Sequence, residues 1–408
     1  MNRIAALGVC AIAALSLAPV SSLAQSNKLG PLEPPIGAVS DTGPDLFQIE
    51  PRTPLSLETT PGDANSIYRI ETPGHYYLTG DLKLGGAALN FNAIEVGASD
   101  VTIDLNGFRI DGIGAGRSGV IVDGLLARVT VKNGSVMNFT LNGVRASGRM
   151  SVVQDVRVSN IVGDQSWGID VGLGGLVERC TVETVTTYGI ETGADSVVRD
   201  CRVIFSDVNG ISVGAYSRVE SSVASVCTTD GFRLGIGASA VDCAARNNGR
   251  DGFHAPTLGS ITRCVSVSND RNGFTLDDNG TVRSSVARMN DNGFVTGPNA
   301  RLENNNSDEN TSGGYEIEDA SIAVGNAARD NGGYGFRVRG RGSNVNRNLS
   351  VGHGYNFWCF GQGALDNSFT QNVAQNAGQS NYYISGNENF FHAVDSAASA
   401  TPLANISQ

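Results

Sequence analysis

The sequence predicts one all-β solenoid in which short parallel strands from successive repeats stack along a single axis. Three observations support this prediction: a repeat of about 21 residues, short runs of β-branched residues without a helical period, and a high glycine content. Glycine supplies 52 of the 408 residues without a Gly-X-Y period, which indicates many tight turns.

Each repeat begins with a glycine followed by one apolar residue, which we expect to point into the core. From Gly168 to Gly335 the spacing of these glycines is constant, apart from one interval that is shorter by a single position. Asn356 and Asn381 continue the series, so the chain contains about thirteen repeats. The glycine anchors are Gly119, Gly143, Gly168, Gly189, Gly210, Gly231, Gly252, Gly273, Gly293, Gly314 and Gly335.

The runs within a repeat are too short for helices and are separated by Gly, Asn, Asp or Ser, as expected for strands joined by turns. A unit of this size cannot bury its own apolar face. Successive units must therefore stack with parallel strands about 4.8 Å apart. The length alone would suggest two or three domains, but the repeat reduces this number to one.

Twelve positions after the anchors, each coil carries a small polar residue that we expect at an inside corner. These positions should stack as a ladder, with amide hydrogen bonds where the residue is Asn. The ladder consists of Cys180, Cys201, Ser222, Cys243, Cys264, Ser285, Asn305 and Asn326. The spacing lacks the CxxC pattern of a metal site.

Stacking places Cys180 near Cys201, and Cys243 near Cys264, at separations that a disulfide accepts. The sequence leaves the state of these pairs open, and buried free thiols are our preferred interpretation. Cys227 and Cys359 have no partner in this register.

Asn or Asp often precedes the anchor. We interpret these residues as turn formers that tolerate left-handed backbone, and not as a carboxylate active site. They are Asn142, Asn209, Asp230, Asp251, Asn272 and Asn292.

The segment 1–24 is predicted to be a secretory signal: Arg3 supplies the positive charge, positions 4–20 the apolar run, and Ser22-Leu23-Ala24 a cleavage site. We therefore expect an exported protein, periplasmic or extracellular, without a membrane span elsewhere. The remaining chain divides into an extended linker or strap (25–61), an N-terminal cap with irregular first coils (62–118), the regular solenoid (119–390) and a tail (391–408).

Acidic residues outnumber basic ones by 40 to 29, and the net charge is −11. This balance argues against nucleic acid or an anionic membrane as a partner.

The repeats, with their loose Asn/Cys, Asn and Gly-Ile/Phe positions, resemble right-handed parallel β-helix proteins of the pectate-lyase-like class. The segments YRIETPGHYYLTGDL (68–82) and VTIDLNGF (101–108) are similar to the N-terminal part of exported bacterial members. This resemblance implies a single-stranded right-handed parallel β-helix of about 12–13 coils, each of about 21 residues, with an N-terminal cap. It also implies a polysaccharide partner. The class contains lyases, hydrolases, epimerases and proteins of no known reaction, so the resemblance does not specify an activity.

If the residue after each glycine points inward, the next residue points to solvent. The resulting outward column consists of Arg145, Asp170, Glu191, Ser212, Arg233, His254, Thr275, Val295, Glu316, Arg337, Trp358 and Tyr383. Its central part spans about 20 Å at about 4.8 Å per coil, which suits several sugar units.

Asp170, Glu191, Arg233 and His254 are the candidate catalytic residues of this column. The Asp170–Glu191 pair can serve as acid and nucleophile in glycoside hydrolysis, or bind calcium, the one cofactor that the pattern suggests. Arg233 or His254 can act as a base, and histidine is better suited near neutral pH. The alternative is a solvated polar column whose charges pair along the stack.

Near the C-terminal end, Arg337, Arg339, Trp358 and Tyr383 are candidate substrate-binding residues. Guanidinium groups and aromatic rings suit sugar carboxylates and sugar faces. The alternative is that Arg339 is simply a solvated loop charge.

These residues predict a protein that acts on or binds polysaccharide, and a uronate-polymer lyase is the preferred activity if it is an enzyme. A non-catalytic glycan-binding or structural solenoid is the first alternative, and a glycoside hydrolase the second. The fragments LDD (276–278) and GHG (352–354) resemble pieces of the polygalacturonase-type hydrolase pattern, but they lie between three and four coils apart. We therefore interpret them as chance matches.

Overall fold

The computed structural model describes residues 52–85, 90–122, 124, 126–361, 363–386, 388–391, 393–394 and 404–408. They all belong to one compact unit, Glu50–Gln408. The predicted signal peptide (1–24) and most of the predicted linker (25–61) lie outside the described residues. The described residues form strands and turns without any helix, so none of them forms a helix that could cross a membrane.

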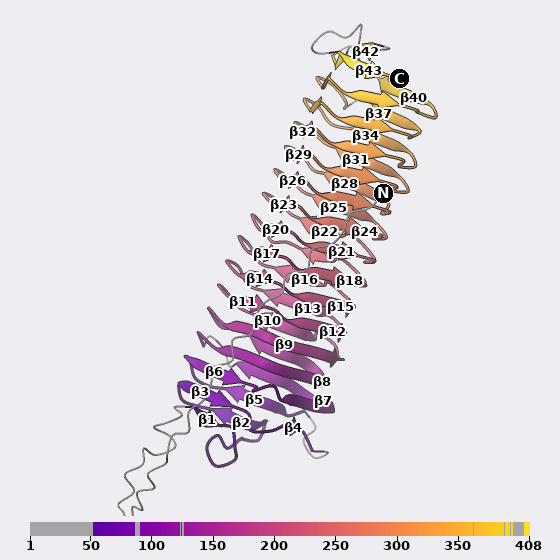
Figure 1. Cartoon of the computed structure of the whole chain (residues 1–408). Helices are drawn as coiled ribbons and strands as arrows, with labels where there is room; N and C mark the ends of the chain where they lie inside the picture. Colours follow the sequence, from indigo (N-terminus) through magenta and orange to yellow (C-terminus); the bar gives the residue numbers. More distant parts are fainter. Residues whose placement is uncertain are drawn as a thin grey trace, which may run out of the picture. The chain divides into compact units, whose positions relative to one another are not determined.

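The fold is a right-handed parallel β-helix, as predicted. Each regular coil contributes one strand to each of three rows, and each strand pairs in parallel with its equivalent in the next coil. Figure 1 shows these rows along the length of the helix. The described part contains one isolated antiparallel bridge, between Pro61 and Tyr68.

Row 1 carries the outward column. Its strands are β2 (Ser66–Ile70), β5 (Asn92–Val96), the ends of β7 (Arg109–Val122) and β8 (Thr130–Ala146), β10 (Trp167–Val171), β13 (Tyr188–Thr192), β16 (Ile211–Val213), β19 (Phe232–Arg233), β22 (Phe253–Ala255), β25 (Asn272–Leu276), β28 (Asn292–Thr296), β31 (Gly313–Ile317), β34 (Tyr334–Val338), β37 (Tyr355–Cys359) and β40 (Ser380–Ile384).

Row 2 follows row 1 in each coil. Its strands are β1 (Thr53–Pro54), β3 (Gly74–Tyr77), β6 (Val101–Asp104), the starts of β8 and β9 (Val152–Ile161), β11 (Leu176–Glu178), β14 (Val197–Arg199), β17 (Arg218–Glu220), β20 (Ser239–Val241), β23 (Ser260–Thr262), β26 (Thr281–Arg283), β29 (Arg301–Glu303), β32 (Ile322–Val324), β35 (Asn344–Asn346), β38 (Ser368–Thr370) and β41 (Phe390–Phe391).

Row 3 completes the coil. Its strands are β4 (Leu82–Lys83), further segments of β7, β8 and β9, β12 (Thr181–Val185), β15 (Arg202–Ser206), β18 (Val223–Ser225), β21 (Ala244–Arg246), β24 (Val265–Val267), β27 (Val286–Arg288), β30 (Asn306–Asp308), β33 (Ala327–Arg329), β36 (Leu349–Val351), β39 (Val373–Gln375) and β43 (Asn405–Ser407), to which β42 (Ala393–Val394) is added.

The helix has about 16 coils, because segments outside the regular repeat also form coils. The segment expected as an N-terminal cap provides β2, β3 and β4, which pair in register with β5, β6 and β7. At the other end, β43 in the predicted tail pairs with β39. Both terminal segments therefore extend the rows.

The apolar residue after each anchor points inward, as predicted. Eight aromatic rings in this position form one continuous stack with centroid separations of 4.5–5.0 Å, and all of them except the partly buried Tyr382 are fully buried. The stack consists of Phe232, Phe253, Phe274, Phe294, Tyr315, Phe336, Phe357 and Tyr382. The rings stack because parallel strands hold equivalent side chains one strand spacing apart.

The anchor must be glycine because row 3 of the same coil and the backbone of the next coil both lie directly against it. A Cβ atom on Gly252 would lie 2.0 Å from the Ser266 hydroxyl and 2.7 Å from the carbonyl oxygen of Gly273. The glycine therefore serves close backbone approach and not a left-handed turn.

The turns use left-handed residues at other positions, directly before the inside-corner residues. Examples are Asp195 (φ 55°), Asp200 (φ 54°) and Asn247 (φ 54°). The Asn and Asp residues before the anchors are not among the left-handed residues of the described chain. Our interpretation of those residues as left-handed turn formers was wrong, and Asp230 and Asp251 are instead buried beside row 1.

The predicted ladder is present, with direct bonds between coils. In its Asn part, the Asn305 side-chain amide donates to the side-chain oxygen of Asn326 at 3.0 Å. A second ladder at the next corner runs through Asn248, Asn269, Asn290, Asn310, Asn331 and His353. His353 of the GHG fragment is thus a buried corner residue.

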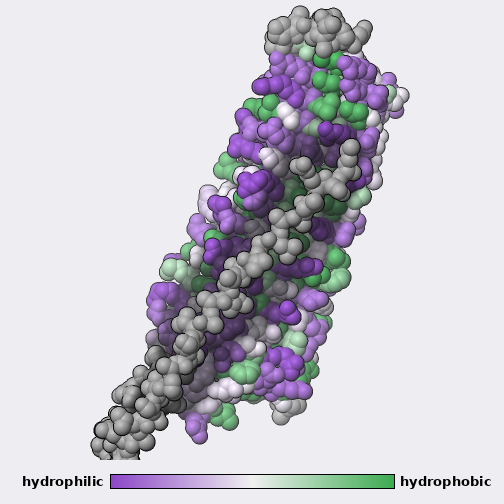
Figure 2. Space-filling view, viewed as in Figure 1, coloured by the Kyte–Doolittle hydropathy of each residue, from purple (hydrophilic) through white to green (hydrophobic). Residues whose placement is uncertain are grey.

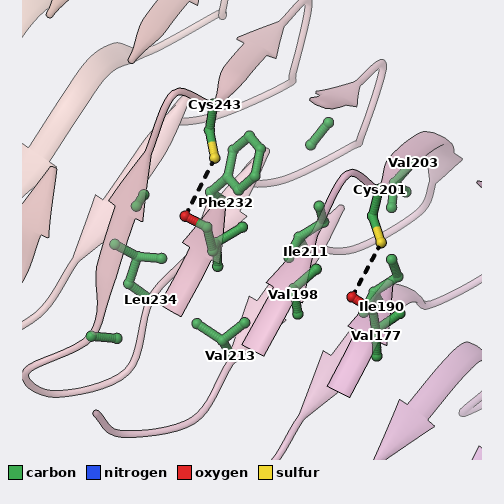
Figure 3. Close-up of a cluster of buried hydrophobic side chains, with 14 of the residues drawn as sticks. Val177, Ile190, Val198, Cys201, Val203, Ile211, Val213, Phe232, Leu234 and Cys243 are labelled. Carbon is green, nitrogen blue, oxygen red and sulfur yellow. Dashed lines mark hydrogen bonds between the residues drawn. The ribbon is translucent and has the colours of Figure 1, made fainter. Parts of the chain in front are cut away.

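The six cysteines of the described chain are buried free thiols. Figure 3 shows Cys201 and Cys243 among core side chains, each directed at a carbonyl oxygen of the preceding coil. The Cys201 Sγ lies 3.5 Å from the Val177 oxygen, and the Cys243 Sγ lies 3.7 Å from the Val219 oxygen. They pack in the core, in agreement with our preferred interpretation.

We predict that Asn310→Ala destabilises the helix. The substitution removes the acceptor for the backbone N–H of Asn290, a bond of 2.9 Å, and the amide contact to Asn331. We expect the free energy of unfolding to fall by about 1–3 kcal/mol for each buried group left unsatisfied, measured by urea denaturation. The control Asn306→Ala lies on an exposed position of β30 and should change little. Equal effects of the two substitutions would contradict this role of the ladder.

Candidate functional site

The outward column lies on row 1 in the predicted register. Asp170 pairs with Glu191, Arg233 with His254, and Arg337 with Trp358 on adjacent strands. The remaining members, Arg145, Ser212, Thr275, Val295, Glu316 and Tyr383, occupy the intervening and flanking strands. The column divides into three groups of interacting side chains.

Asp170, in the N-terminal group, is engaged with two donors. Its Oδ2 accepts hydrogen bonds from the Ser147 hydroxyl at 2.6 Å and from the Arg145 Nε at 3.2 Å. The guanidinium of Arg145 also lies over the ring of Trp167, 5.2 Å from its centroid. Asp170 is therefore an oriented, ion-paired carboxylate.

Glu191 has a different environment from Asp170, although the two residues are neighbours. It accepts a hydrogen bond from the Trp167 indole N–H. Burial raises the pKa of Glu191. An acid with a raised pKa beside a paired carboxylate is the arrangement that an acid and nucleophile pair needs. No third His, Cys, Asp or Glu side chain of the described chain joins this pair as a possible metal ligand.

The central group places Arg233 and His254 around a buried aspartate that the sequence-based interpretation excluded. Oδ2 of Asp230 lies 3.3 Å from a terminal nitrogen of Arg233 and 3.8 Å from Nδ1 of His254. The same nitrogen of Arg233 lies 3.5 Å from Nδ1 of His254. On the other side of the ring, Nε2 lies 3.7 Å from Oδ2 of Asp277.

Hydrogen bonding, charge and burial shift the pKa values in this group. The Asp230 carboxylate raises the pKa of His254 above its usual range. Burial raises the pKa of Asp230, but His254 and the backbone N–H of Asp251 more than offset this effect, so its pKa is lowered. Burial raises the pKa of Asp251. The group is thus a coupled Asp–His pair with a second buried carboxyl group beside it.

A shallow depression of about 440 Å³ lies next to His254 on the following coils. It is lined by Thr257, Thr275, Leu276, Asp277, Asp278, Val295, Thr296 and Gly297. Asp277 belongs to the LDD fragment, and the structure places this residue beside His254, whereas His353 of the GHG fragment is buried in the second ladder. The two fragments therefore do not form one site.

We missed Asp230, Asp251 and Asp277 from the sequence, although a signal was present. Asp230 and Asp251 each lie three positions before a column residue, Arg233 and His254, in consecutive coils. Applying the coil register to the position before each glycine would have placed two carboxylates next to the histidine.

The C-terminal group forms an aromatic patch, consisting of Tyr355, Trp358, Phe360 and Tyr383. Trp358 stacks on Tyr355 at 5.1 Å, and Tyr383 lies 5.5 Å from Tyr355 and 5.7 Å from Phe360. Phe360 and Tyr383 are exposed. Figure 2 shows hydrophobic side chains near the C-terminal end of the visible face.

The two candidate arginines of this group share Glu316 as a partner and differ in their other contacts. The guanidinium of Arg337 lies 4.6 Å from the centroid of Trp358, which extends the aromatic patch along the column. A terminal nitrogen of Arg337 also lies 3.7 Å from Glu316, whereas Arg339 pairs with Glu316 at 2.5 Å and lies 3.8 Å from Glu318. The structure thus brings Arg337, Trp358 and Tyr383 together and directs Arg339 toward carboxylates.

No family model matches the chain, and no curated protein matches it. Solved structures of similar fold include a pectate lyase, Pel9A, with 17% identity over 64% of this chain and 69% of that chain, and a TM-score of 0.35. The A-module of the Azotobacter vinelandii mannuronan C-5 epimerase AlgE6 has 14% identity, covers 82% and 91% of the two chains, and has a TM-score of 0.43. A mannuronic acid specific polysaccharide family 6 lyase from human gut microbiota has 11% identity, covers 84% and 85%, and has a TM-score of 0.42. At these identities the similarity concerns the fold alone.

We predict that Asp230→Asn lowers the pKa of His254 toward the ordinary histidine value of 6.5, because the carboxylate that raises it is removed. An NMR titration of the imidazole resonances measures this change. Because the pKa of His254 is raised in the folded state, its protonation stabilises the folded protein at pH values below the ordinary histidine pKa. This contribution is lost as the pH rises through the raised pKa.

The stability difference between wild type and Asp230→Asn should therefore be larger at about pH 5 than at about pH 9. Asp242→Asn is the matched control, since Asp242 pairs with Arg263 away from the column. An unchanged His254 titration in Asp230→Asn would contradict the coupling.

Proposed function

We propose that the protein is a polysaccharide lyase that cleaves uronate polymers along the outward column of row 1, with His254 as the base. One observation carries this proposal: an Asp–His pair with an adjacent arginine lies on the same column as an exposed aromatic patch. Five coils separate His254 from Trp358, or about 24 Å at about 4.8 Å per coil, which accommodates several sugar units.

Arg233 is suited to bind the uronate carboxylate. Its side chain is 48% exposed, and a guanidinium can form two parallel hydrogen bonds with a carboxylate. This pairing stabilises the negative charge that develops on the carboxylate when the neighbouring C–H bond breaks. Arg233 therefore takes the role of charge stabiliser in this proposal.

His254 is suited to remove the proton at carbon 5 of the uronate. Asp230 lies at Nδ1, so Nε2 is the nitrogen that accepts the proton on the side of the depression. The C–H electron pair forms the double bond between carbons 4 and 5 while the bond from carbon 4 to the glycosidic oxygen breaks. The imidazolium can then return the proton to the departing oxygen, so the elimination consumes no water.

The aromatic patch is suited to hold a sugar several units away from the reacting bond. Exposed rings bind the apolar faces of sugars, and Arg337 beside Trp358 adds a donor for a uronate carboxylate. Binding energy gained there can position the reacting unit at His254.

A non-catalytic glycan-binding protein is the second candidate. The observation that favours it is that charges within the column already pair with one another, as in Arg145 with Asp170 and Arg337 with Glu316. In that case the aromatic patch would bind glycan without cleavage. A hydrolase at Asp170 and Glu191 is a third candidate, favoured by the raised pKa of Glu191.

The sequence of the segment 1–24 supports export, which fits an extracellular or periplasmic polysaccharide substrate. We include export in the proposal on this basis.

Incubation with a panel of uronate polymers, with and without calcium, separates these candidates. A lyase produces ultraviolet-absorbing unsaturated ends, and a hydrolase produces reducing ends without this absorbance. Binding without either product supports the second candidate. The proposal would be contradicted if no polymer of the panel gave a product and none bound to the protein.

We predict that His254→Ala lowers kcat by roughly 10²–10⁴-fold, the usual contribution of a general base. In the wild type, activity should rise with pH through a pKa above the ordinary histidine value, because Asp230 raises it. The matched control is His75→Ala, an exposed histidine on β3 of row 2, which should retain activity. Full activity of His254→Ala would show that His254 is not the catalytic base.

We predict that Trp358→Ala raises KM for long polymers with little change in kcat, because the aromatic patch binds sugars remote from the reacting bond. Short oligomers that do not reach the patch should show no difference. Phe205→Ala is the control, since Phe205 is an exposed aromatic residue on β15 of row 3. If Trp358→Ala and wild type had a similar KM for long polymers, the result would contradict sugar binding by the aromatic patch.

A further inference from the structure

We propose that Asp230, Asp251 and His254 form a binding site for a divalent transition-metal ion of the Zn²⁺ type. We further infer that a bound ion and the base role of His254 exclude each other, a second step that rests on the proposed function. The metal site itself is independent of that function. It combines the column residue His254 with two buried aspartates just before strands β19 and β22, at a position that the sequence patterns associated only with turns.

The three side chains converge at one point. Their ligand atoms lie within 4.8 Å of one another, and no other such group of three occurs in the described part of the chain. The side chains of Asp230 and Asp251 are 1% and 0% exposed. Because the two aspartates occupy the same position in consecutive coils, strand stacking sets their separation. His254 follows Asp251 on β22 of the same coil.

In each aspartate, one carboxylate oxygen accepts a hydrogen bond from a backbone N–H of the next coil, and the other oxygen does not take part in this bond. The backbone N–H of Asp251 donates to Oδ1 of Asp230 at 3.3 Å, and the backbone N–H of Asn272 donates to Oδ1 of Asp251 at 3.1 Å. Oδ2 of Asp251 is completely buried and forms no hydrogen bond of normal geometry, although the Thr275 side chain lies near this carboxyl group. A buried carboxylate oxygen without a partner is costly, and a cation would remove this cost.

The donor set fits a transition metal. Two carboxylates and one imidazole leave a coordination position open on a tetrahedral ion, and imidazole favours zinc-like metals over calcium. Asp277 lies on the Nε2 side of His254, opposite Asp230. A carboxylate near the second ring nitrogen is the arrangement that orients metal-binding histidines.

The ion would also change the chemistry of the ring. If Nδ1 binds the ion, Nε2 holds the remaining proton of the neutral imidazole and cannot accept another. A site with bound metal would therefore lack the base of the proposed lyase reaction. Metal binding would act as an inhibitor of the same site.

Arg233 competes with the ion for these ligands. One of its terminal nitrogens lies 3.3 Å from Oδ2 of Asp230 and 3.5 Å from Nδ1 of His254, so its positive charge faces two of the three ligand atoms. Its side chain is half-exposed and has room to turn outward. Removal of this charge should strengthen metal binding.

Titration of the chelator-treated full chain with Zn²⁺ by calorimetry, and with Co²⁺ by visible absorption, tests the site. We expect one ion per chain. Asp251→Asn should weaken binding by at least roughly tenfold, and Arg233→Gln should strengthen it several-fold. Asp242→Asn, at an exposed ion pair with Arg263, should bind as the wild type does. Circular dichroism checks that each variant is folded.

Three results would overturn the site: no ion bound by the wild type, equal affinity in Asp251→Asn and wild type, or weaker binding in Arg233→Gln. If a polymer is cleaved, Zn²⁺ should inhibit the reaction, and retained full activity with the ion bound would overturn the exclusion step. If no polymer is cleaved, the lyase proposal fails while the titrations still decide the metal site.

Discussion

The parallel pairing of each strand with its equivalent one coil further is the interaction on which the other features depend. Because the repeat length is constant in most coils, pairing aligns identical positions, so each choice of residue is repeated at about one strand spacing. The aromatic stack and the two Asn ladders are direct consequences. A glycine at the anchor is required for the same reason, since the next coil leaves no space for a Cβ atom.

The same alignment determines what the outer surface can do. Like charges in one position must lie close together in consecutive coils, as Asp170 and Glu191 do on row 1 and as Asp230 and Asp251 do just before its strands β19 and β22. Each pair is then modified by side chains of its own coil or of an adjacent coil. Arg145 neutralises Asp170, whereas Arg233 and His254 face Asp230 and leave one oxygen of Asp251 without a partner. A regular scaffold thus produces chemically distinct sites through local differences in neighbouring side chains.

The outward column could be predicted residue by residue, because alternation along a strand and a fixed repeat are sufficient to derive it. The environment of each residue could not. Arg339 was grouped with the aromatic residues on the basis of sequence proximity, but two glutamates hold it. Asp230 and Asp251 were interpreted as turn residues because Asp is common in turns, whereas the left-handed positions lie at other corners of the coil. Whether a polar residue is buried depends on its contacts with other coils. The residue type alone does not specify these contacts.

The sequence by itself determined the fold class, the register, the inward apolar positions, the first ladder and the membership of the column. These properties repeat with a constant period, so local pattern and backbone pairing are enough to derive them. Only the tertiary structure decided which carboxylates are buried, which cations neutralise them, that Asp277 lies beside His254, and that Phe360 joins Tyr383 in the aromatic patch. These properties depend on side-chain contacts between coils and on departures from the repeat, where the period carries no information.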